Sequence, residues 1–184
     1  MGCSLTASGC FDWEMPPHTV TVRKGFYLGQ TEVTQEAYQR VTGSNPSRYR
    51  GPRLPVEQVG WNEARRYCQA VGMRLPTEME WEFAARGGSN EARYAAIDAM
   101  AWYDGNSADK THEVGQKASN AYGLFDMLGN VWEWVEDTYE MNTTKRILRG
   151  GSFVNLARDL RVSNRLWAAP DTRHRNIGVR CAGN

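Results

Sequence analysis

Four cysteines and three histidines are the side chains best suited to redox, nucleophilic or metal chemistry in this 184-residue chain. The cysteines, at positions 3, 10, 68 and 181, form no Cys-x-x-Cys pair, and the histidines are scattered, so no zinc-ligand cluster is indicated. Cys3 with Cys10 would close a short loop, and Cys68 with Cys181 would tie a helix to the C-terminal end. Other pairings, or four unpaired thiols in a reducing compartment, remain open.

Carboxylates are the second group with possible chemistry. In Gly-Asn-Val-Trp-Glu-Trp, which ends at Trp134, strand alternation would point Trp132 and Trp134 to one face and Val131 and Glu133 to the other. A carboxylate that faces inward needs an arginine, backbone donors or a cation as its partner. Ser152 follows two glycines and has no evident His/Asp partner, so we interpret it as a turn residue rather than a nucleophile.

The elements that must position these residues change character along the chain. Helical periodicity predicts three helices, at 31–42, 61–71 and 77–86. Thr34 is a candidate N-cap, and Thr77 with Glu80 forms a capping box. Alternation and turn signals predict short strands at 18–29 (a pair broken at Lys24-Gly25), 131–135, 147–154, 161–164 and 177–181. Helices followed by short strands and long turns indicate an α+β fold in a single domain.

The charge balance narrows the possible partners. The 22 Lys and Arg against 21 Asp and Glu give a net charge of +1, which argues against a nucleic-acid binder of the basic-tail type. No apolar run approaches the ~20 residues of a membrane-spanning helix, so no membrane span is predicted. From Lys145 onward the chain is basic, whereas 120–142 is acidic. Such opposed blocks are expected to pair within one fold.

Four segments together resemble the formylglycine-generating enzyme (sulfatase-modifying factor) family. They are GQTEVT (29–34), RLPTEMEWEFAARGG (74–88), NAYGLFDMLGNVWEW (120–134), and the run from RGGS at 149 to GVRC at 181. The resemblance extends from about residue 11 to the end. It implies a C-type-lectin-like α+β fold with two main helices, short antiparallel strands and much irregular structure, built as one domain over residues 1–184.

The resemblance also bears on catalysis. In the enzymes of the family, two cysteines five residues apart follow the Gly-Gly-Ser motif, bind copper and activate oxygen to oxidise a substrate cysteine. The corresponding positions in this chain hold Asn155 and Leu160. Neither supplies a thiolate, so no copper and no formylglycine formation by that chemistry are expected. A disulfide between Cys68 and Cys181 is implied as well, and it favours an extracellular or surface-displayed location.

A structural calcium ion is a further implication of the resemblance. Its ligands would be the side chains of Asp126 and Glu133 and the carbonyls of Gly129 and Val131, a donor set that suits a hard cation. Asn106 would belong to a second site. The alternative for Asp126 and Glu133 is an acid pair neutralised by nearby arginines.

Residues 149–181 are expected to be the variable or ligand-binding segment. In the enzymes this surface holds the substrate peptide, and diversity-generating retroelements vary the same region in ligand-binding proteins built on this fold. Trp167, in an apolar stretch, is either core packing or an exposed contact. The predicted contact residues, within about 153–175, are Phe153, Val154, Asn155, Leu156, Asp159, Leu160, Leu166, Trp167, Ala168, Ala169, Thr172, His174 and Arg175.

We therefore predict a non-catalytic, monomeric protein that binds a protein or peptide ligand through this segment, with diversification by a retroelement as one origin of the surface. The alternative is an oxidoreductase of the same family with altered chemistry, acting on a peptide or small molecule. A third option is a binding domain related to family members fused to kinases.

Overall fold

The computed structural model describes residues 1–4 and 9–184 and has the expected α+β architecture. The helices are α1 (Gln35–Thr42), α2 (Trp61–Ala70), α3 (Glu78–Arg86) and α4 (Ile97–Met100), with 3₁₀ turns η1 (Asp12–Glu14) and η2 (Ala157–Asp159). The strands are β1 (Tyr27–Leu28), β2 (Trp132–Tyr139), β3 (Asn142–Arg149), β4 (Arg165–Ala168), β5 (Ile177–Gly178) and β6 (Ala182–Gly183).

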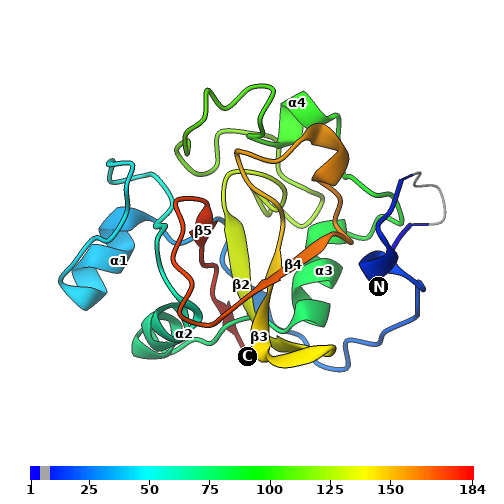
Figure 1. The fold of residues 1–184 in the computed structure, drawn as a ribbon, viewed down its shortest axis with the longest axis horizontal. Coiled ribbons are helices and arrows are strands. Elements are labelled where there is room, and N and C mark those ends of the chain that lie inside the picture. Colours follow the sequence, from blue (N-terminus) through cyan, green and yellow to red (C-terminus); the bar gives the residue numbers. More distant parts are fainter. Residues whose placement is uncertain (5–8) are drawn as a thin grey trace.

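A four-stranded sheet in the order β4-β3-β2-β5 forms the centre of the molecule. β2, β3 and β4 are antiparallel neighbours, whereas β5 runs parallel to β2. β1 pairs with β6 in a separate two-stranded sheet, which places the early chain beside the C-terminal end. Figure 1 shows α1 and α2 on one side of the central strands and α3 on the other.

The three predicted helices are confirmed, and their ends have local causes. The Thr34 hydroxyl accepts a hydrogen bond from the Ala37 amide at 3.3 Å, and α1 ends at Gly43, whose positive φ favours glycine. At α3 the predicted capping box is present: Thr77 Oγ1 accepts from the Glu80 amide at 3.2 Å, and Glu80 Oε2 accepts from the Thr77 amide at 2.8 Å.

The strand boundaries differ from the predicted ones. The strand expected at 147–154 ends at Arg149, because Gly150 and Gly151 adopt φ values of +97° and +76° and turn the chain away from the sheet. Residues 161–164, expected as a strand, do not form one. They lead into β4, which begins at Arg165. Of the strand pair expected at 18–29, only Tyr27–Leu28 is paired in a sheet.

Tryptophans on β2 join the sheet to α2. As predicted, Trp132 and Trp134 lie on one face, and both belong to the core cluster that includes α2 residues. Trp134 Nε1 donates to the Val59 carbonyl at 2.9 Å, and Trp61 Nε1 donates to the Val135 carbonyl at 2.8 Å. Each indole therefore buries its large apolar area while its N–H group keeps a hydrogen-bond partner.

Both candidate disulfides are present, Cys3–Cys10 and Cys68–Cys181. The second joins α2 to the residue just before β6 and closes a loop of 113 residues, against 7 for the first. None of the helices in the described part of the chain has the length and apolarity needed to cross a membrane.

The loop between α1 and α2 is held by a buried carboxyl group. Glu57 Oε1 accepts from the Tyr49 amide at 2.9 Å, and the Glu57 amide donates to Ser47 Oγ at 3.1 Å. No described residue donates a hydrogen bond to Glu57 Oε2. Burial raises the pKa of Glu57 from 4.5 to about 7, against the opposing effect of the Tyr49 amide.

We expect the long-range disulfide to contribute more to stability than the short one. In the chain-entropy model, opening the Cys68–Cys181 loop with alanine at both positions lowers the free energy of unfolding by about 5 kcal/mol, and opening Cys3–Cys10 in the same way by about 2 kcal/mol. Chemical denaturation of the two double variants measures the difference. Equal losses would show that loop length does not set the contribution.

We also expect Glu57 to make the protein less stable as the pH rises. Because its folded pKa is raised, the folded state binds the proton more tightly than the unfolded chain does, so stability declines from about pH 4.5 to about pH 7 and is then constant. In the Glu57→Gln variant this pH dependence disappears. At pH 8 its free energy of unfolding is higher than that of the parent by roughly 2–3 kcal/mol. Urea unfolding of both proteins between pH 4 and 8 tests this; parallel profiles would contradict it.

Candidate functional site

The positions that carry copper-binding cysteines in the family's enzymes hold structural side chains in this protein. Asn155 Oδ1 accepts hydrogen bonds from the Ser152 amide at 2.9 Å and the Ser152 hydroxyl at 2.7 Å, which closes a turn. Leu160 is fully buried beside Gly151, where an added Cβ would lie 2.2 Å from Leu160 Cδ2. All four cysteines are in disulfides, so no free thiol exists in the described chain.

Two predicted contact residues do not reach the surface. Phe153 is fully buried, with the Tyr49 ring edge-on at 5.7 Å and the Arg175 guanidinium 5.2 Å from its centroid. Leu160 belongs to the core cluster around α3. The prediction that these two side chains contact a ligand is wrong, because both are large apolar groups that the turns around them direct into the core.

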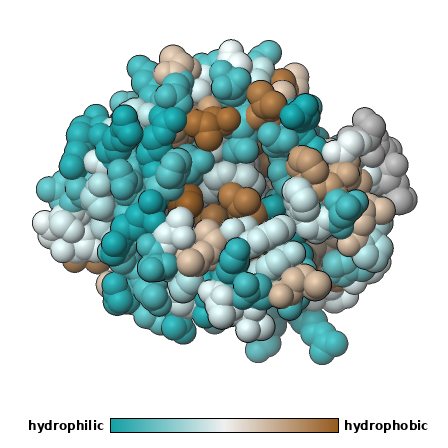
Figure 2. Space-filling view, in the orientation of Figure 1, coloured by the Kyte–Doolittle hydropathy of each residue, from teal (hydrophilic) through white to brown (hydrophobic). Residues whose placement is uncertain are grey.

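The other predicted contact residues are exposed or half-buried, and we call them the contact face. Leu156 and Leu166 are 45% and 40% exposed, a high fraction for large apolar side chains. Figure 2 shows hydrophobic residues gathered around a hollow near the centre of this side of the molecule. The contact face consists of Val154, Asn155, Leu156, Asp159, Leu166, Trp167, Ala168, Ala169, Thr172, His174 and Arg175.

Trp167 belongs to neither core cluster, but its ring packs against other aromatic side chains. Its ring is stacked on Tyr139 of β2, with centroids 4.0 Å apart and an interplanar angle of 4°, and Trp13 meets it edge-on at 5.8 Å. Trp13 Nε1 in turn donates to Asn164 Oδ1 at 3.2 Å. The half-buried indole is thus one member of a surface aromatic cluster formed by Trp13, Tyr139 and Trp167.

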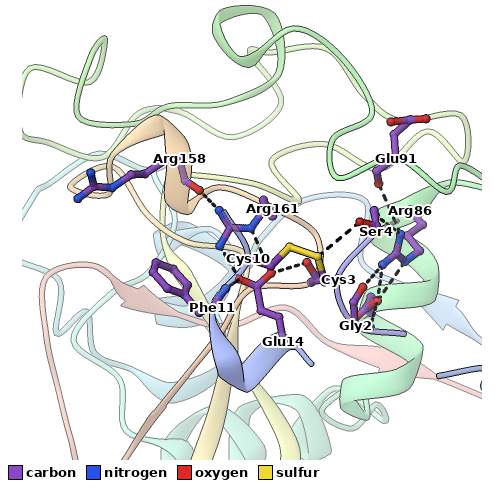
Figure 3. Close-up of a disulfide and its surroundings, with 12 residues drawn as sticks. Gly2, Cys3, Ser4, Cys10, Phe11, Glu14, Arg86, Glu91, Arg158 and Arg161 are labelled. Atoms are coloured by element: carbon purple, nitrogen blue, oxygen red, sulfur yellow. Dashed lines mark hydrogen bonds and ion pairs between the residues drawn. A yellow bond between two sulfur atoms is a disulfide. The ribbon is translucent and has the colours of Figure 1, made fainter. Parts of the chain in front are cut away.

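The segment before residue 18, for which the sequence indicated no role, is bonded to the C-terminal segment. The buried Glu14 carboxylate accepts from Arg161 and from the Ser163 hydroxyl, the latter at 2.6 Å. Figure 3 shows Glu14 and Arg161 pointing toward each other beside the Cys3–Cys10 disulfide. Burial raises the pKa of Glu14, but the hydrogen bonds from Arg161 and Ser163 outweigh it and hold the pKa below its usual value.

A cleft of about 510 Å³ lies between this N-terminal segment, the start of α3 and the β2–β3 turn. Its wall includes the exposed apolar side chains of Trp13, Met15 and Met141. Its carboxylates are largely paired: Arg165, for example, contacts Glu78 at 2.8 Å and Glu140 at 2.6 Å. The cleft therefore adjoins the aromatic cluster, because Trp13 and Tyr139 are part of its wall.

Arg175 is fixed within the contact face. Its guanidinium makes two hydrogen bonds to the Asp109 carboxylate, both 2.9 Å long, and a further one to the Tyr49 hydroxyl. Since the same group also covers the Phe153 ring, Arg175 joins three separate loops. Its side chain is still 23% exposed, so it is part of the contact face.

Glu133, expected as a calcium ligand, has other partners in the structure. Its carboxylate accepts from Trp81 Nε1 at 2.6 Å and from Arg180 at 2.8–3.0 Å, and all three side chains are buried. Arg180 also donates to the carbonyls of Gly29 and Phe125, each at 2.8 Å. In this structure Glu133 is therefore paired with an arginine, which was the alternative to a calcium ligand.

The other expected calcium ligands have different surroundings. Asp126 Oδ2 accepts from the Gly115 amide at 2.6 Å, but no described residue donates to Oδ1. The Asn106 side chain joins its own loop, accepting from the Tyr103 amide and donating to the Ala101 carbonyl, both at 3.0 Å. In residues 1–4 and 9–184, no group of three or more His, Cys, Asp or Glu side chains is arranged to hold a metal ion. Calcium binding thus stays a prediction.

One buried acid near this network had no assigned role in the sequence analysis. Glu32 is 1% exposed, and no described residue donates a hydrogen bond to either of its carboxylate oxygens. Burial, with the nearby negative charge of Asp126, raises the pKa of Glu32 well above its usual value. Burial likewise raises the pKa of Asp126. The only sequence signal for Glu32 was its place in the motif at 29–34.

Comparison with known proteins gives this geometry its context. Residues 2–184 match the family model described as sulfatase-modifying factor enzyme 1-like domain. The chain is 38% identical over 152 residues to the inactive C-alpha-formylglycine-generating enzyme 2 of Mus musculus, covering 71% of this chain and 49% of that protein. The chain spans about half the length of the curated relatives it matches first.

Two solved structures are similar over most of their length. PvdO from Pseudomonas aeruginosa superimposes with a TM-score of 0.91 at 29% identity, covering 100% of this chain and 90% of that one. Treponema denticola variable protein 1 superimposes with a TM-score of 0.81 at 30% identity, covering 86% and 84%. With the four motifs, the fold and the match over residues 2–184 in agreement, the chain belongs to the formylglycine-generating enzyme (sulfatase-modifying factor) family and has its C-type-lectin-like fold.

Proposed function

We propose that this protein is a non-catalytic ligand-binding member of its family and that the contact face binds a protein or peptide. The observation that carries the proposal is the replacement of both copper-binding positions, by a turn amide at Asn155 and a core side chain at Leu160. Because all four cysteines are in disulfides, no other thiol replaces them. What remains at the position of the active site is a surface rather than a reactive centre.

The arrangement of the C-terminal segment supports a binding role. Its skeleton residues point inward: Arg149 and Arg161 are buried and form ion pairs with Glu82 and Glu14. Most of the exposed side chains of this segment lie from Leu156 to Arg175, on both sides of the Arg161 anchor. Because these ion pairs are made by buried side chains, the residues at the surface can vary in sequence without breaking the ion pairs that fix the backbone.

The chemistry of the contact face suits a peptide or protein surface. Exposed Leu156 and Leu166 and the edge of Trp167 offer apolar contact area, and aromatic residues are enriched among those that dominate binding energy. The adjoining cleft adds Trp13 and Met15 beside paired acids. Apolar anchors with a polar rim are typical of protein interfaces.

We further propose that this surface is diversified by a retroelement, supported by the likeness to a protein named as variable in Treponema denticola. The test is the DNA around the gene. We expect a nearby, near-identical template repeat that differs mainly at adenines, beside a reverse-transcriptase gene. A neighbourhood without such a repeat would refute diversification while leaving binding open.

Trp167 provides the test of the contact face. A peptide selected from a displayed random library against the parent protein should bind Trp167→Ala about thirtyfold more weakly, a loss of about 2 kcal/mol, because an aromatic anchor is removed. Loss of the stacking on Tyr139 should lower the unfolding free energy by only about 1 kcal/mol. Calorimetry and thermal melting measure the two effects.

The control is Tyr27→Ala, which removes an aromatic side chain that is 74% exposed and lies outside the contact face. Its affinity for the same peptide should equal that of the parent. If Trp167→Ala binds as tightly as Tyr27→Ala for every selected peptide, the contact face lies elsewhere.

Catalysis is tested directly with a peptide thiol. Incubated with copper, oxygen and a cysteine-containing peptide, the protein should form no aldehyde above the level of a protein-free control, because neither Asn155 nor Leu160 supplies a thiolate to hold copper. Mass spectrometry with a hydrazide probe detects the aldehyde. An aldehyde that forms only when the protein is present would contradict the non-catalytic assignment and favour the oxidoreductase alternative.

A further inference from the structure

A second apolar recess, which we call the α3 recess, shares no residue with the contact face or with the cleft described above. It has a volume of about 430 Å³ and is formed by residues 22–28, by Phe83 and Ala84 of α3, and by Tyr122 and Leu124. Ala84 and Leu124 are buried. The recess therefore has an apolar base, and it lies outside the surface to which the proposed function assigns a ligand.

Three aromatic side chains of the α3 recess are exposed to an unusual degree. Tyr27, Phe83 and Tyr122 are 74%, 44% and 51% exposed, respectively. The Phe83 ring packs against those of Tyr122 and Phe26, with centroids 5.9 and 6.3 Å apart, so the rings orient one another. Large apolar side chains that are exposed together around one hollow, rather than scattered over a surface, mark an interaction site.

The charge of the α3 recess is not balanced. Arg23 and Lys24 are exposed members of its lining, and the lining contains no Asp or Glu. Neither side chain forms an ion pair or a hydrogen bond with any residue that the structure describes. By contrast, Arg149 and Arg165, which line the cleft, are both paired with glutamates. The two unpaired cations therefore favour a partner that carries negative charge.

The backbone beside the α3 recess is also open. Residues 19–23 alternate between exposed and half-buried side chains, as a strand does, yet no other backbone segment of the described chain pairs with them. They lead into β1, whose one strand neighbour within the described chain is β6. Free N–H and C=O groups at the end of a sheet can pair with an extended peptide, and a neighbouring pocket can then hold one of its side chains.

We propose that the α3 recess binds an extended, acidic segment of a partner protein. One aromatic or large aliphatic side chain of that segment contacts the rings of Phe83 and Tyr122. Carboxylates on either side of it pair with Arg23 and Lys24, and its backbone pairs with residues 19–23. The proposal is independent of the proposed function, since the two surfaces share no residue.

Other occupants fit these observations less well. In a two-fold interface, a second copy of the chain would bring its own Arg23 and Lys24 to the site, and like charges would oppose each other. An anionic membrane offers no backbone groups to residues 19–23, and lipid-binding clusters usually contain about 4–8 cations rather than two. An acidic peptide supplies negative charge, an apolar side chain and backbone groups at once.

The experiment titrates the full, isotopically labelled chain with synthetic peptides at ~0.15 M salt and follows the backbone amide signals by NMR. The probe is the peptide acetyl-Glu-Val-Glu-Phe-Glu-Val-Glu-amide. At millimolar concentration it should shift the amide signals of residues 19–28 and of Phe83, whereas those of the contact face should not move. A peptide with Lys in place of each Glu, or with Ala in place of Phe, should bind more weakly by about tenfold or more.

Two pairs of variants test the assignment. Lys24→Glu should weaken binding of the acidic peptide by about fivefold or more, whereas Arg66→Glu, the same charge change at an exposed site on α2, should bind within about twofold of the parent. Phe83→Ala should weaken binding by about tenfold, whereas Val41→Ala, which shortens a 41% exposed apolar side chain on α1, should not. Because Lys24 has no hydrogen bond or ion pair to lose, Lys24→Glu should melt like the parent, which separates lost binding from lost folding.

The proposal fails if the acidic peptide shifts no signal at millimolar concentration, or if the Lys-containing peptide binds equally well. It also fails if the shifted signals belong to the contact face, or if Lys24→Glu binds as tightly as Arg66→Glu. Shifts of residues 19–28 that grow with protein concentration alone would show that a second copy covers the recess. Binding to phosphatidylserine vesicles in preference to the peptide would show that the recess meets a membrane instead.

Discussion

A buried guanidinium holds together the parts of this protein that have no regular structure. Arg180 is fully buried and joins Glu133 on β2 to the carbonyls of Gly29 and Phe125, so one side chain connects two of the other family motifs to the motif that contains it. Arginine suits this role because its planar fork carries five N–H donors and stays charged when buried. Removing one partner of such a pair leaves an unpaired buried charge, which is strongly destabilising.

A second buried arginine has a similar role on the same face of the sheet, directly opposite Glu133 in the β2–β3 pair. Arg149, at the end of β3, pairs with Glu82 of α3 and donates to the carbonyls of Val162, Ser163 and Asn164. The chain from 150 to 164 has no strand partner for these carbonyls, so the guanidinium satisfies them instead. The basic C-terminal block and the acidic residues before it therefore pair largely within the fold, which leaves the surface between the anchors free to carry other side chains.

This construction relates the shape of the protein to its proposed function. Anchors such as Arg149 and Arg161 fix the backbone from inside, and the N-terminal segment adds Glu14 to the same network. A binding surface whose backbone is fixed loses little conformational entropy on association. Trp167 shows the arrangement on a small scale, since its ring is oriented by Tyr139 and Trp13 while one edge remains accessible.

The sequence by itself determined what depends on neighbours in the chain: the three main helices with their caps at Thr34 and Thr77, the shared face of Trp132 and Trp134, and the motifs that define the family. Only the tertiary structure decided which charges meet. Glu14 and Arg161 are 147 residues apart, so no local pattern could pair them. For the same reason the burial of Phe153 and Leu160 and the isolation of Glu32 were not predictable, because each depends on which distant side chains pack around it.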